Sequence, residues 1–430
     1  MVGSVENHNK RKKIYIHVQA CDRRGLDANK TAKYLSKNNY EIVNRAKNAD
    51  IILFFACAAL NTITEDSLKT IKKFQKYDAE LIIAGCLPEI EKEKLSKIFN
   101  GKTICTKDIE KIDTIFPENR IKYSTTDDAN IVFKNLNELS PLEILKRTFR
   151  SIKSIESIYI NVKNHIFKNL FGENSFIYRV FPDPLLYHVR TSTGCSGNCS
   201  YCSIKKGIGP CASKPLEDCI EEFRNGLNKG YKRFAIDGDD TGAYGIDIGS
   251  NLPELLYKIT EIQGDYKISI RNIRPDWIVR YINDLEIILK RKKIISIESS
   301  IQSGSIRILK LMNRYSDIEK MKNAFLRLKK SFPSISLVTD YIIGFPTESE
   351  EDFKQTLDYL KEINFNAGMI IPFSCNTGTE AEKIVPKITR KDTYRRIKNA
   401  KKFLKKSGYH ILFIPWNELF IFWNENYKNS

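Results

Sequence analysis

Apolar and polar positions in the first hundred residues alternate between two periods. Short apolar runs bounded by polar residues predict strands, and segments with an apolar residue every three or four positions predict helices. In chain order, the pattern predicts a strand at 14–20, a helix at 27–38, a strand at 50–57, a helix at 64–77, a strand at 80–87 and a helix at 88–99. Strands that alternate with helices in this way favour a parallel sheet covered by helices.

The same alternation resumes near residue 185 and continues to residue 374. It predicts six strands, at 185–191, 233–239, 267–274, 294–302, 335–345 and 367–374. Helices are predicted between them at 215–227, 252–262, 277–290, 317–330 and 350–363. Six consecutive βα units favour a partial barrel, whose functional residues lie at the C-terminal ends of its strands.

Two segments break the alternation. Residues 120–180 are rich in Asn and Ser and hold an amphipathic basic run at 142–170, which predicts a connector with one or two helices. Residues 387–406 carry ten Lys or Arg residues against the single acid Asp392, with apolar residues at helical spacing. We therefore expect four parts: an N-terminal domain at 1–119, a basic connector at 120–180, a second domain at 181–385 and a basic C-terminal tail at 386–430.

Composition narrows the class of protein. The chain has 430 residues, of which 42% are hydrophobic and 28% charged, as in ordinary soluble proteins. It has no run of the ~20 apolar residues that a membrane span needs, and its start has no apolar signal region, so we expect a cytoplasmic protein. The net charge of +18 favours a polyanionic partner such as nucleic acid. A Lys-rich background composition would produce the same charge without any partner.

Three of the ten cysteines lie within eight residues, in the run Cys195-Ser-Gly-Asn-Cys199-Ser-Tyr-Cys202. The cytosol keeps thiols reduced, which favours metal ligation or catalysis over a disulfide framework. Structural zinc usually takes four ligands in two separated pairs. Three thiolates this close together on a glycine-containing loop after a predicted strand favour three corners of an iron–sulfur cubane instead.

The CxxxCxxC spacing, with the aromatic Tyr201 before the last cysteine, resembles the signature of radical S-adenosylmethionine (SAM) enzymes. In that superfamily the open iron of the cluster chelates the amino and carboxylate groups of SAM. An electron from the cluster then splits the sulfonium and yields a 5′-deoxyadenosyl radical. The resemblance implies that Cys195, Cys199 and Cys202 are catalytic residues that hold a [4Fe–4S] cluster, with SAM as cofactor and Tyr201 beside it.

Further motifs resemble those of the methylthiotransferase family, from about residue 14 to residue 385. They are Ala84-Gly-Cys-Leu87, Gly238-Asp-Asp-Thr-Gly-Ala-Tyr-Gly245, Gln302-Ser-Gly-Ser305, Thr339-Asp-Tyr-Ile-Ile-Gly-Phe-Pro346 and Thr377-Gly-Thr-Glu-Ala381. We therefore expect an α/β protein with an N-terminal flavodoxin-like parallel-sheet domain plus a radical SAM partial (β/α)6 barrel.

The family resemblance also implies a second [4Fe–4S] cluster, held by Cys21, Cys57 and Cys86. Each of these residues lies at or just after the end of a predicted strand, so one edge of a parallel sheet would bring the three together. From spacing alone, isolated cysteines of this kind are more often core residues. The remaining cysteines have no ligand-like spacing and are expected to be ordinary thiols: Cys105, Cys211, Cys219 and Cys375.

Five further polar residues stand at the C-terminal ends of predicted barrel strands: Asp239, Asp240, Arg271, Gln302 and Asp340. Side chains at this end of a barrel line the active site, which favours contacts with SAM or the substrate. The same side chains would equally serve to satisfy backbone groups of the loops. Both interpretations remain open at this point.

The chain departs from the family pattern near these motifs. The family usually has Asn three residues after the first cysteine, where this chain has Arg24, and Asn-Thr or Asn-Ser before the second, where it has Phe55-Ala56. The usual His and Pro before Gln-Ser are replaced by Glu298 and Ser300. Residues around a cluster tune it without binding it, so these changes bear on the substrate more than on cluster binding.

The run from Asp240 to Gly245, followed by Asp247 to Pro253, looks most like the branch that acts on N6-threonylcarbamoyladenosine in tRNA. Other branches usually carry Gln where this chain has Asp239. The implied reaction adds a methylthio group to C2 of the adenine. One SAM methylates a sulfur associated with the N-terminal cluster, and a second SAM provides the radical that removes hydrogen from C2. The implied partners are tRNA and an electron donor such as flavodoxin or ferredoxin.

The C-terminal segment does not resemble the small β-barrel RNA-binding (TRAM) domain with which this family usually ends, since its first half predicts a basic helix. If RNA is the substrate, we expect the helix to contact phosphates through Arg390, Arg395, Arg396, Lys398, Lys402 and Lys405. Two alternatives remain open. One is a methylthiotransferase that acts on a protein or peptide side chain, and the other is a non-catalytic iron–sulfur RNA-binding protein.

Overall fold

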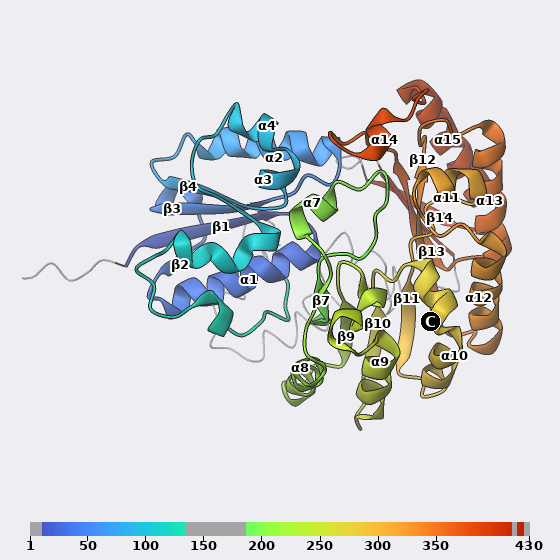
Figure 1. Ribbon diagram of the computed structural model, residues 1–430, viewed down its shortest axis with the longest axis horizontal. Coiled ribbons are helices and arrows are strands. Elements are labelled where there is room, and N and C mark those ends of the chain that lie inside the picture. Colours follow the sequence, from blue (N-terminus) through green and yellow to red (C-terminus); the bar gives the residue numbers. More distant parts are fainter. Residues whose placement is uncertain (1–10, 134–185, 415–418, 425–430) are drawn as a thin grey trace, which may run out of the picture. The chain divides into compact units, whose positions relative to one another are not determined.

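The computed structural model describes residues 11–133, 186–414 and 419–424 (Figure 1). The chain divides into two compact units, with residues up to 148, apart from 60–62, in the first and the remainder in the second. The basic run predicted at 142–170 lies outside the described residues. The two units are described one at a time.

The first unit is built on a five-stranded parallel sheet in the order β2-β1-β3-β4-β5. Its strands are β1 (Lys13–Gln19), β2 (Glu41–Val43), β3 (Ile51–Ala56), β4 (Glu80–Gly85) and β5 (Thr103–Cys105). This strand order is that of flavodoxin-like sheets, as predicted. All six residues of β3 are buried, because the central strand of a parallel sheet is covered on both faces.

Helices of the first unit are α1 (Asp22–Lys37), α2 (Asn61–Phe74), α3 (Leu87–Ile90) and α4 (Lys92–Ser96), with 3-10 turns at Ala46–Asn48, Thr106–Thr114 and Tyr123–Thr125. Helix α1 begins five residues before the predicted start. Its first turn contains Arg24, which is buried and forms an ion pair of 2.8 Å with the buried Asp27 in the next turn, so the hydrophobic pattern did not reveal that this turn is buried. The helix predicted at 88–99 is two short helices, separated by the non-helical Glu91.

The second unit contains six adjacent parallel strands in chain order, which confirms the predicted (β/α)6 arrangement. They are β6 (Leu186–Arg190), β9 (Arg233–Asp237), β10 (Lys267–Ile270), β11 (Ile294–Glu298), β12 (Ser336–Ile343) and β13 (Ala367–Pro372). The helices that follow these strands are α8 (Leu216–Asn228), α9 (Leu252–Glu261), α10 (Pro275–Leu289), α12 (Ile318–Ser331) and α13 (Glu350–Ile363).

Shorter elements occupy the loops of this unit. The loop after β6 contains a two-stranded antiparallel ribbon of β7 (Ser192–Thr193) and β8 (Ala212–Ser213), and α7 (Ile204–Ile208) lies between them in the chain. Other loops contain α11 (Ile306–Leu311), α14 (Glu380–Lys383) and 3-10 turns at Thr241–Ala243 and Ile246–Ile248. Most of these short elements follow the carboxyl end of a barrel strand.

The C-terminal segment differs from the predicted basic tail. Helix α15 (Arg390–Lys406) is present as expected, but β14 (His410–Ile414) and β15 (Leu419–Trp423) follow it and extend the barrel sheet to eight strands. Strand β15 pairs antiparallel with β13, and Leu419 and Ile421 pack against the barrel core. The sequence pattern missed these strands because Pro415 and Asn417 interrupt the apolar run.

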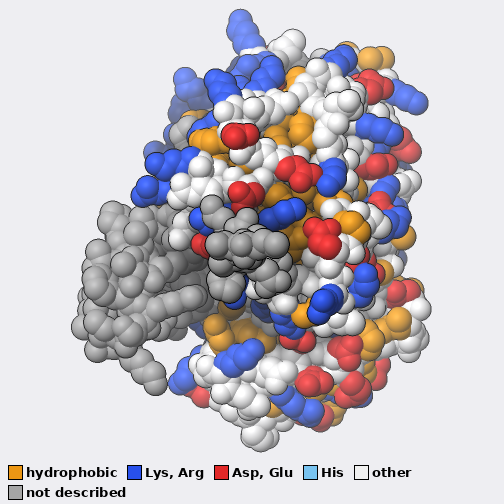
Figure 2. Space-filling view, turned by 90° about the vertical axis from the view of Figure 1, so that its left-hand side faces the viewer, with side chains coloured by type: hydrophobic (Ala, Val, Ile, Leu, Met, Phe, Trp, Pro, Cys, Tyr) orange, Lys and Arg blue, Asp and Glu red, His pale blue; other side chains and the backbone are white. Residues whose placement is uncertain are grey.

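Basic side chains are unevenly distributed on the surface. Figure 2 shows one face, on which Lys and Arg side chains gather in the upper part, whereas acidic and basic side chains are mixed lower down. On this face, basic side chains are therefore not evenly spread.

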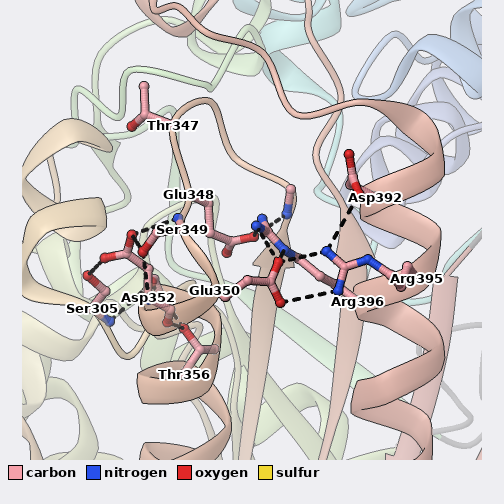
Figure 3. Close-up of polar contacts among 12 residues, drawn as sticks. Ser305, Thr347, Glu348, Ser349, Glu350, Asp352, Thr356, Asp392, Arg395 and Arg396 are labelled. Atoms are coloured by element: carbon pink, nitrogen blue, oxygen red, sulfur yellow. Dashed lines mark hydrogen bonds and ion pairs between the residues drawn. The ribbon is translucent and has the colours of Figure 1, made fainter.

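Helix α15 is joined to the loop before α13 by an ion-pair network (Figure 3). Arg396 is 5% exposed, and its guanidinium contacts Glu348 at 2.8 Å and Glu350 at 2.8 Å. Arg395 contacts Glu350 at 2.7 Å from a half-exposed position. The expectation that Arg396 faces phosphates is therefore wrong, because this side chain is buried against carboxylates of its own chain, and Arg395 is already paired.

We expect Arg396→Ala to destabilise the chain by about 3–5 kcal/mol, since it leaves the buried Glu348 without its counter-charge. Arg395→Ala is the matched control and should cost about 1 kcal/mol or less, because an exposed ion pair is screened by water. Urea unfolding of the full chain measures both. Equal losses of stability for the two variants would contradict this account.

Candidate active site

The loop that follows β6 carries the clustered cysteines and is held at its start by backbone contacts. Gly194 has a φ of +77°, and a Cβ there would lie 1.7 Å from the carbonyl oxygen of Pro210, so only glycine fits. The amide of Cys195 donates to the carbonyl of Gly209 at 3.2 Å. The loop therefore leaves the strand in one defined direction.

The middle of the loop is anchored by segments far away in the sequence. The Ser200 amide donates to the carbonyl of Met312 at 3.0 Å, and its hydroxyl donates to the carbonyl of Leu311 at 2.7 Å. The Ala381 amide donates to the carbonyl of Ser200 at 2.8 Å. These contacts explain why a Thr-Gly-Thr-Glu-Ala motif at the end of the barrel accompanies the cysteine motif at its beginning.

The three thiols of this loop influence one another electrostatically. Burial raises the pKa of Cys195 to about 12, and the carboxylate of Asp240 and the neighbouring Cys202 add to this effect. Burial and then the charge of Cys199 raise the pKa of Cys202. Burial thus disfavours the thiolate forms of Cys195 and Cys202 unless a cation binds them.

A positively charged side chain lies beside the loop. Arg314 is half-buried, and its Nη1 is 3.7 Å from the sulfur of Cys199. Burial raises the pKa of Tyr201 well above its usual value, and the charge of Cys199 is among the further causes. Tyr201 also packs against a small group of buried hydrophobic residues around Phe345, so its ring anchors the cysteine loop to the core.

Asp240 organises the cysteine loop from the next barrel strand. It is fully buried, and its Oδ2 accepts hydrogen bonds from the hydroxyl and amide of Ser196 at 2.6 and 3.3 Å. Its Oδ1 accepts from the indole N–H of Trp277 at 3.2 Å, and Arg274 lies 3.2 Å from its carboxylate. Asp239 accepts from the Gly194 amide at 3.0 Å. Both aspartates therefore satisfy backbone groups of the loop, which is one of the two roles considered for them.

Three other predicted residues lie on the neighbouring barrel strands and loops. The hydroxyl of Ser300 donates to the carboxylate of Asp340 at 2.6 Å, and Arg271 lies 3.7 Å from Glu298. Glu298 and Ser300 are the positions at which this chain departs from the family pattern. The two departures therefore contact two of the predicted site residues.

Gln302 differs from these neighbours. It has a φ of +76°, a conformation that residues other than glycine seldom adopt. Its carbonyl oxygen Oε1 is buried and has no hydrogen-bond partner among the described residues. An unsatisfied buried acceptor at the active end of a barrel is a place for an N–H group of a ligand.

A second set of three thiols lies at one edge of the sheet of the first unit. Cys57 and Cys86 directly follow β3 and β4, and Cys21 lies two residues after the end of β1, so all three lie at the carboxyl edge of the sheet. Burial raises the pKa of Cys57 to about 12, and the charges of Cys86 and Cys21 raise it further. Gly85 has a φ of +98°, and a Cβ there would lie 2.6 Å from the carbonyl oxygen of Ala56.

Two further residues lie near this edge: Arg24, where the chain departs from the family pattern, and Cys105, which was expected to be an ordinary thiol. Arg24 is 1% exposed, and its Nη1 lies 4.0 Å from the sulfur of Cys86. Cys105 pairs in register with Gly85, burial raises its pKa to about 11, and the charge of Cys86 contributes. Sequence reasoning missed Cys105 because β5 has only three residues, too few for a recognisable period.

The chemistry of both cysteine sets is that of iron–sulfur ligands. In the described part of the chain, no three His, Cys, Asp or Glu side chains are grouped tightly enough to hold a metal ion. A four-iron cluster binds each cysteine thiolate to a different iron. Thiolate is also the ligand that iron–sulfur clusters take, and each set offers three.

Comparison with known proteins identifies the second unit. Residues 189–360 match the radical SAM superfamily over a region that begins in β6 and contains the cysteine loop and β9 to β12. This chain contains a radical SAM domain. Residues 13–106, which contain Cys21, Cys57 and Cys86, match a second family that is described as the uncharacterized protein family UPF0004.

Curated relatives resemble the chain over both units. The human threonylcarbamoyladenosine tRNA methylthiotransferase is 26% identical over 374 residues, which cover 86% of this chain and 59% of the human protein. The ribosomal protein uS12 methylthiotransferase RimO of Carboxydothermus hydrogenoformans is 26% identical over 391 residues, 89% of this chain and 80% of that protein. The chain thus spans about three-fifths of the length of the human relative.

Solved structures share the fold of the radical SAM domain and the unit before it. The radical SAM methyltransferase TsrM from Kitasatospora setae superposes with a TM-score of 0.56 at 9% identity, over 84% of this chain and 75% of TsrM. The cobalamin-dependent radical SAM enzyme OxsB gives a TM-score of 0.52 at 14% identity, over 92% of this chain and 56% of OxsB. At these identities the likeness shows the fold alone. No helix among the described residues has the length and apolar character that crossing a membrane requires.

Proposed function

We propose that this chain is a radical SAM methylthiotransferase that adds a methylthio group to C2 of N6-threonylcarbamoyladenosine in tRNA. The observation that carries the proposal is the presence of two separate sets of three thiols, each at the carboxyl edge of its own parallel sheet. One set of three thiols is enough to hold the cluster that cleaves SAM, and the second set provides a site for the sulfur that is transferred.

Each thiol set has its own assignment in this proposal. Cys195, Cys199 and Cys202 would hold a [4Fe–4S] cluster beside SAM, and Cys21, Cys57 and Cys86 would hold a second one. When bound, the first cluster and SAM supply a radical able to remove hydrogen from an aromatic carbon. Acid–base chemistry cannot perform that step, because the C2–H bond of adenine is not acidic.

The chain's own residues bind and orient the groups that react. Asp239 and Asp240 fix the cysteine loop through Gly194 and Ser196, so their replacement would displace the thiols. The unpaired Oε1 of Gln302 offers a hydrogen-bond acceptor to an amino group of SAM or of the substrate base. Arg314 places a positive charge beside the sulfur of Cys199 and so can hold the cysteine loop in place.

Two observations favour tRNA as the substrate. The relatives named as threonylcarbamoyladenosine tRNA methylthiotransferases come from animals and archaea and align with 86% of this chain. The net charge of +18 suits a phosphate backbone better than a neutral peptide. The match to RimO, which is named for a ribosomal protein, keeps a protein side chain as the second candidate substrate. A small electron-transfer protein such as flavodoxin or ferredoxin would supply the electron.

Mass spectrometry of tRNA nucleosides tests this function. Cells that lack the gene should contain threonylcarbamoyladenosine without its methylthio group, and the wild-type gene should restore the modification. A gene that encodes Cys195→Ala should not restore it, because the radical step is lost. If tRNA nucleosides were unchanged and a ribosomal protein lost a methylthio group instead, the protein-substrate candidate would replace this proposal.

A further inference from the structure

Helix α15 has two chemically different faces. Thr393, Arg396, Ile397, Ala400 and Leu404 are buried against the barrel. The opposite side presents four exposed lysines, here called the lysine face: Lys391, Lys398, Lys402 and Lys405. At 100° per residue these four positions fall within about 60° of one another around the helix axis, so they form one straight row.

The lysine face carries uncompensated positive charge. Among the described residues, none of its four ammonium groups has an ion pair or a hydrogen bond with an acid. The acid of the helix, Asp392, accepts from the Thr389 hydroxyl at 2.6 Å and lies 3.5 Å from Arg395. Arg395 in turn is paired with Glu350 (Figure 3), so it contributes little free charge to the row.

The row matches an extended polyanion in length and chemistry. From Lys391 to Lys405 the helix rises by about 21 Å, which spans several phosphates of a nucleic-acid strand. Lysine binds phosphate as a point charge and does not demand a particular base. Four like charges in a row repel one another, and a polyanion relieves that repulsion.

The buried side of α15 excludes insertion of this helix into a membrane. An amphipathic helix binds a bilayer by inserting its apolar face between the lipids. In this chain that face is occupied, because Ile397, Ala400 and Leu404 pack inside the unit. Only electrostatic contact with phosphates is left to the helix.

We propose that the lysine face of α15 binds the phosphate backbone of the tRNA substrate and holds it without reading its sequence. This inference rests on the proposed function for the identity of the polyanion. It assigns the RNA contact to a helix that packs against the barrel sheet, and it replaces the expectation that Arg395 and Arg396 take part.

The test compares two quadruple variants of the full chain that lose the same charge. One changes Lys391, Lys398, Lys402 and Lys405 to Gln. The control changes four exposed lysines on or next to α10, α12 and α13 to Gln: Lys290, Lys330, Lys354 and Lys361. Binding of unmodified tRNA is measured by fluorescence anisotropy under anaerobic conditions at several salt concentrations. Cleavage of SAM without substrate confirms that each variant retains an intact barrel.

The lysine-face variant should bind tRNA at least tenfold more weakly at about 0.1 M salt, and the slope of log affinity against log salt should flatten by about 3. The control should remain within about threefold of the wild type, because charges elsewhere act only through the screened long-range field. Equal weakening of both variants would show that net charge alone matters and would overturn the proposal.

Other outcomes separate this inference from the function on which it rests. Wild-type protein that binds no tRNA would overturn the proposed function together with the inference. Wild-type binding that the lysine-face substitutions leave unchanged would overturn the inference alone. Binding to phosphatidylserine vesicles is measured in the same way. If the lysine-face variant kept tRNA binding but lost vesicle binding, the partner of this face would be an anionic lipid surface.

Discussion

Replacing Cys195, Cys199 and Cys202 together by Ala should abolish reductive cleavage of SAM and lower the iron content of anaerobically reconstituted protein from about eight atoms per chain to about four. The remaining iron is expected because the second thiol set belongs to a different sheet, whose edge the substitutions do not touch. Iron analysis and chromatography of 5′-deoxyadenosine measure the two effects. Retention of about four atoms would also show that the first unit still folds.

A matched control is Cys219→Ala, which removes a thiol that is buried in α8 away from the cysteine loop. This variant should keep the full iron content and normal SAM cleavage. If the triple variant lost all of its iron, Cys21, Cys57 and Cys86 would not form an independent site. If it kept the full amount, the assignment of the loop cysteines would be wrong.

Cys57→Ala should separate the two halves of the reaction. The variant should still cleave SAM under reducing conditions, because the radical SAM domain and its loop are unchanged. It should form no methylthio product, since Cys57 follows β3, the strand between those that precede Cys21 and Cys86, and its loss would remove the middle thiol of the set. The measurement is liquid chromatography and mass spectrometry of tRNA nucleosides after a single anaerobic incubation.

The control for this variant is Cys105→Ala, because Cys105 lies at the same edge of the sheet but was not expected to bind iron. If only the predicted set binds the cluster, Cys105→Ala should form product. Normal methylthiolation by Cys57→Ala would show that sulfur is not held at this edge. Loss of product in both variants would assign a role to Cys105 as well.

Much of the architecture was predictable from the sequence because, in parallel α/β folds, apolar strands alternate regularly with amphipathic helices. Each barrel strand from β6 to β13 is an apolar run long enough to show its period, and helices of ten or more residues separate most of them. The cysteine loop was predictable for a similar reason, since Cys195, Cys199 and Cys202 are neighbours in the chain. Parallel strands also end at a common edge, so the sequence predicts that Cys21, Cys57 and Cys86 lie at one edge of the sheet.

Tertiary structure decided what depends on partners distant in the sequence. Arg396 is indistinguishable from its basic neighbours in the sequence, yet it is buried against Glu348, almost fifty residues away. Cys105 joins the cysteine edge through a three-residue strand, and Asp240 meets Trp277 and Ser196 only when the barrel forms. Strands β14 and β15 complete the sheet by pairing with β13. The local sequence pattern shows which face of a helix or strand is apolar. Ion pairs, short strands and loop contacts depend instead on which surfaces the folded chain brings together.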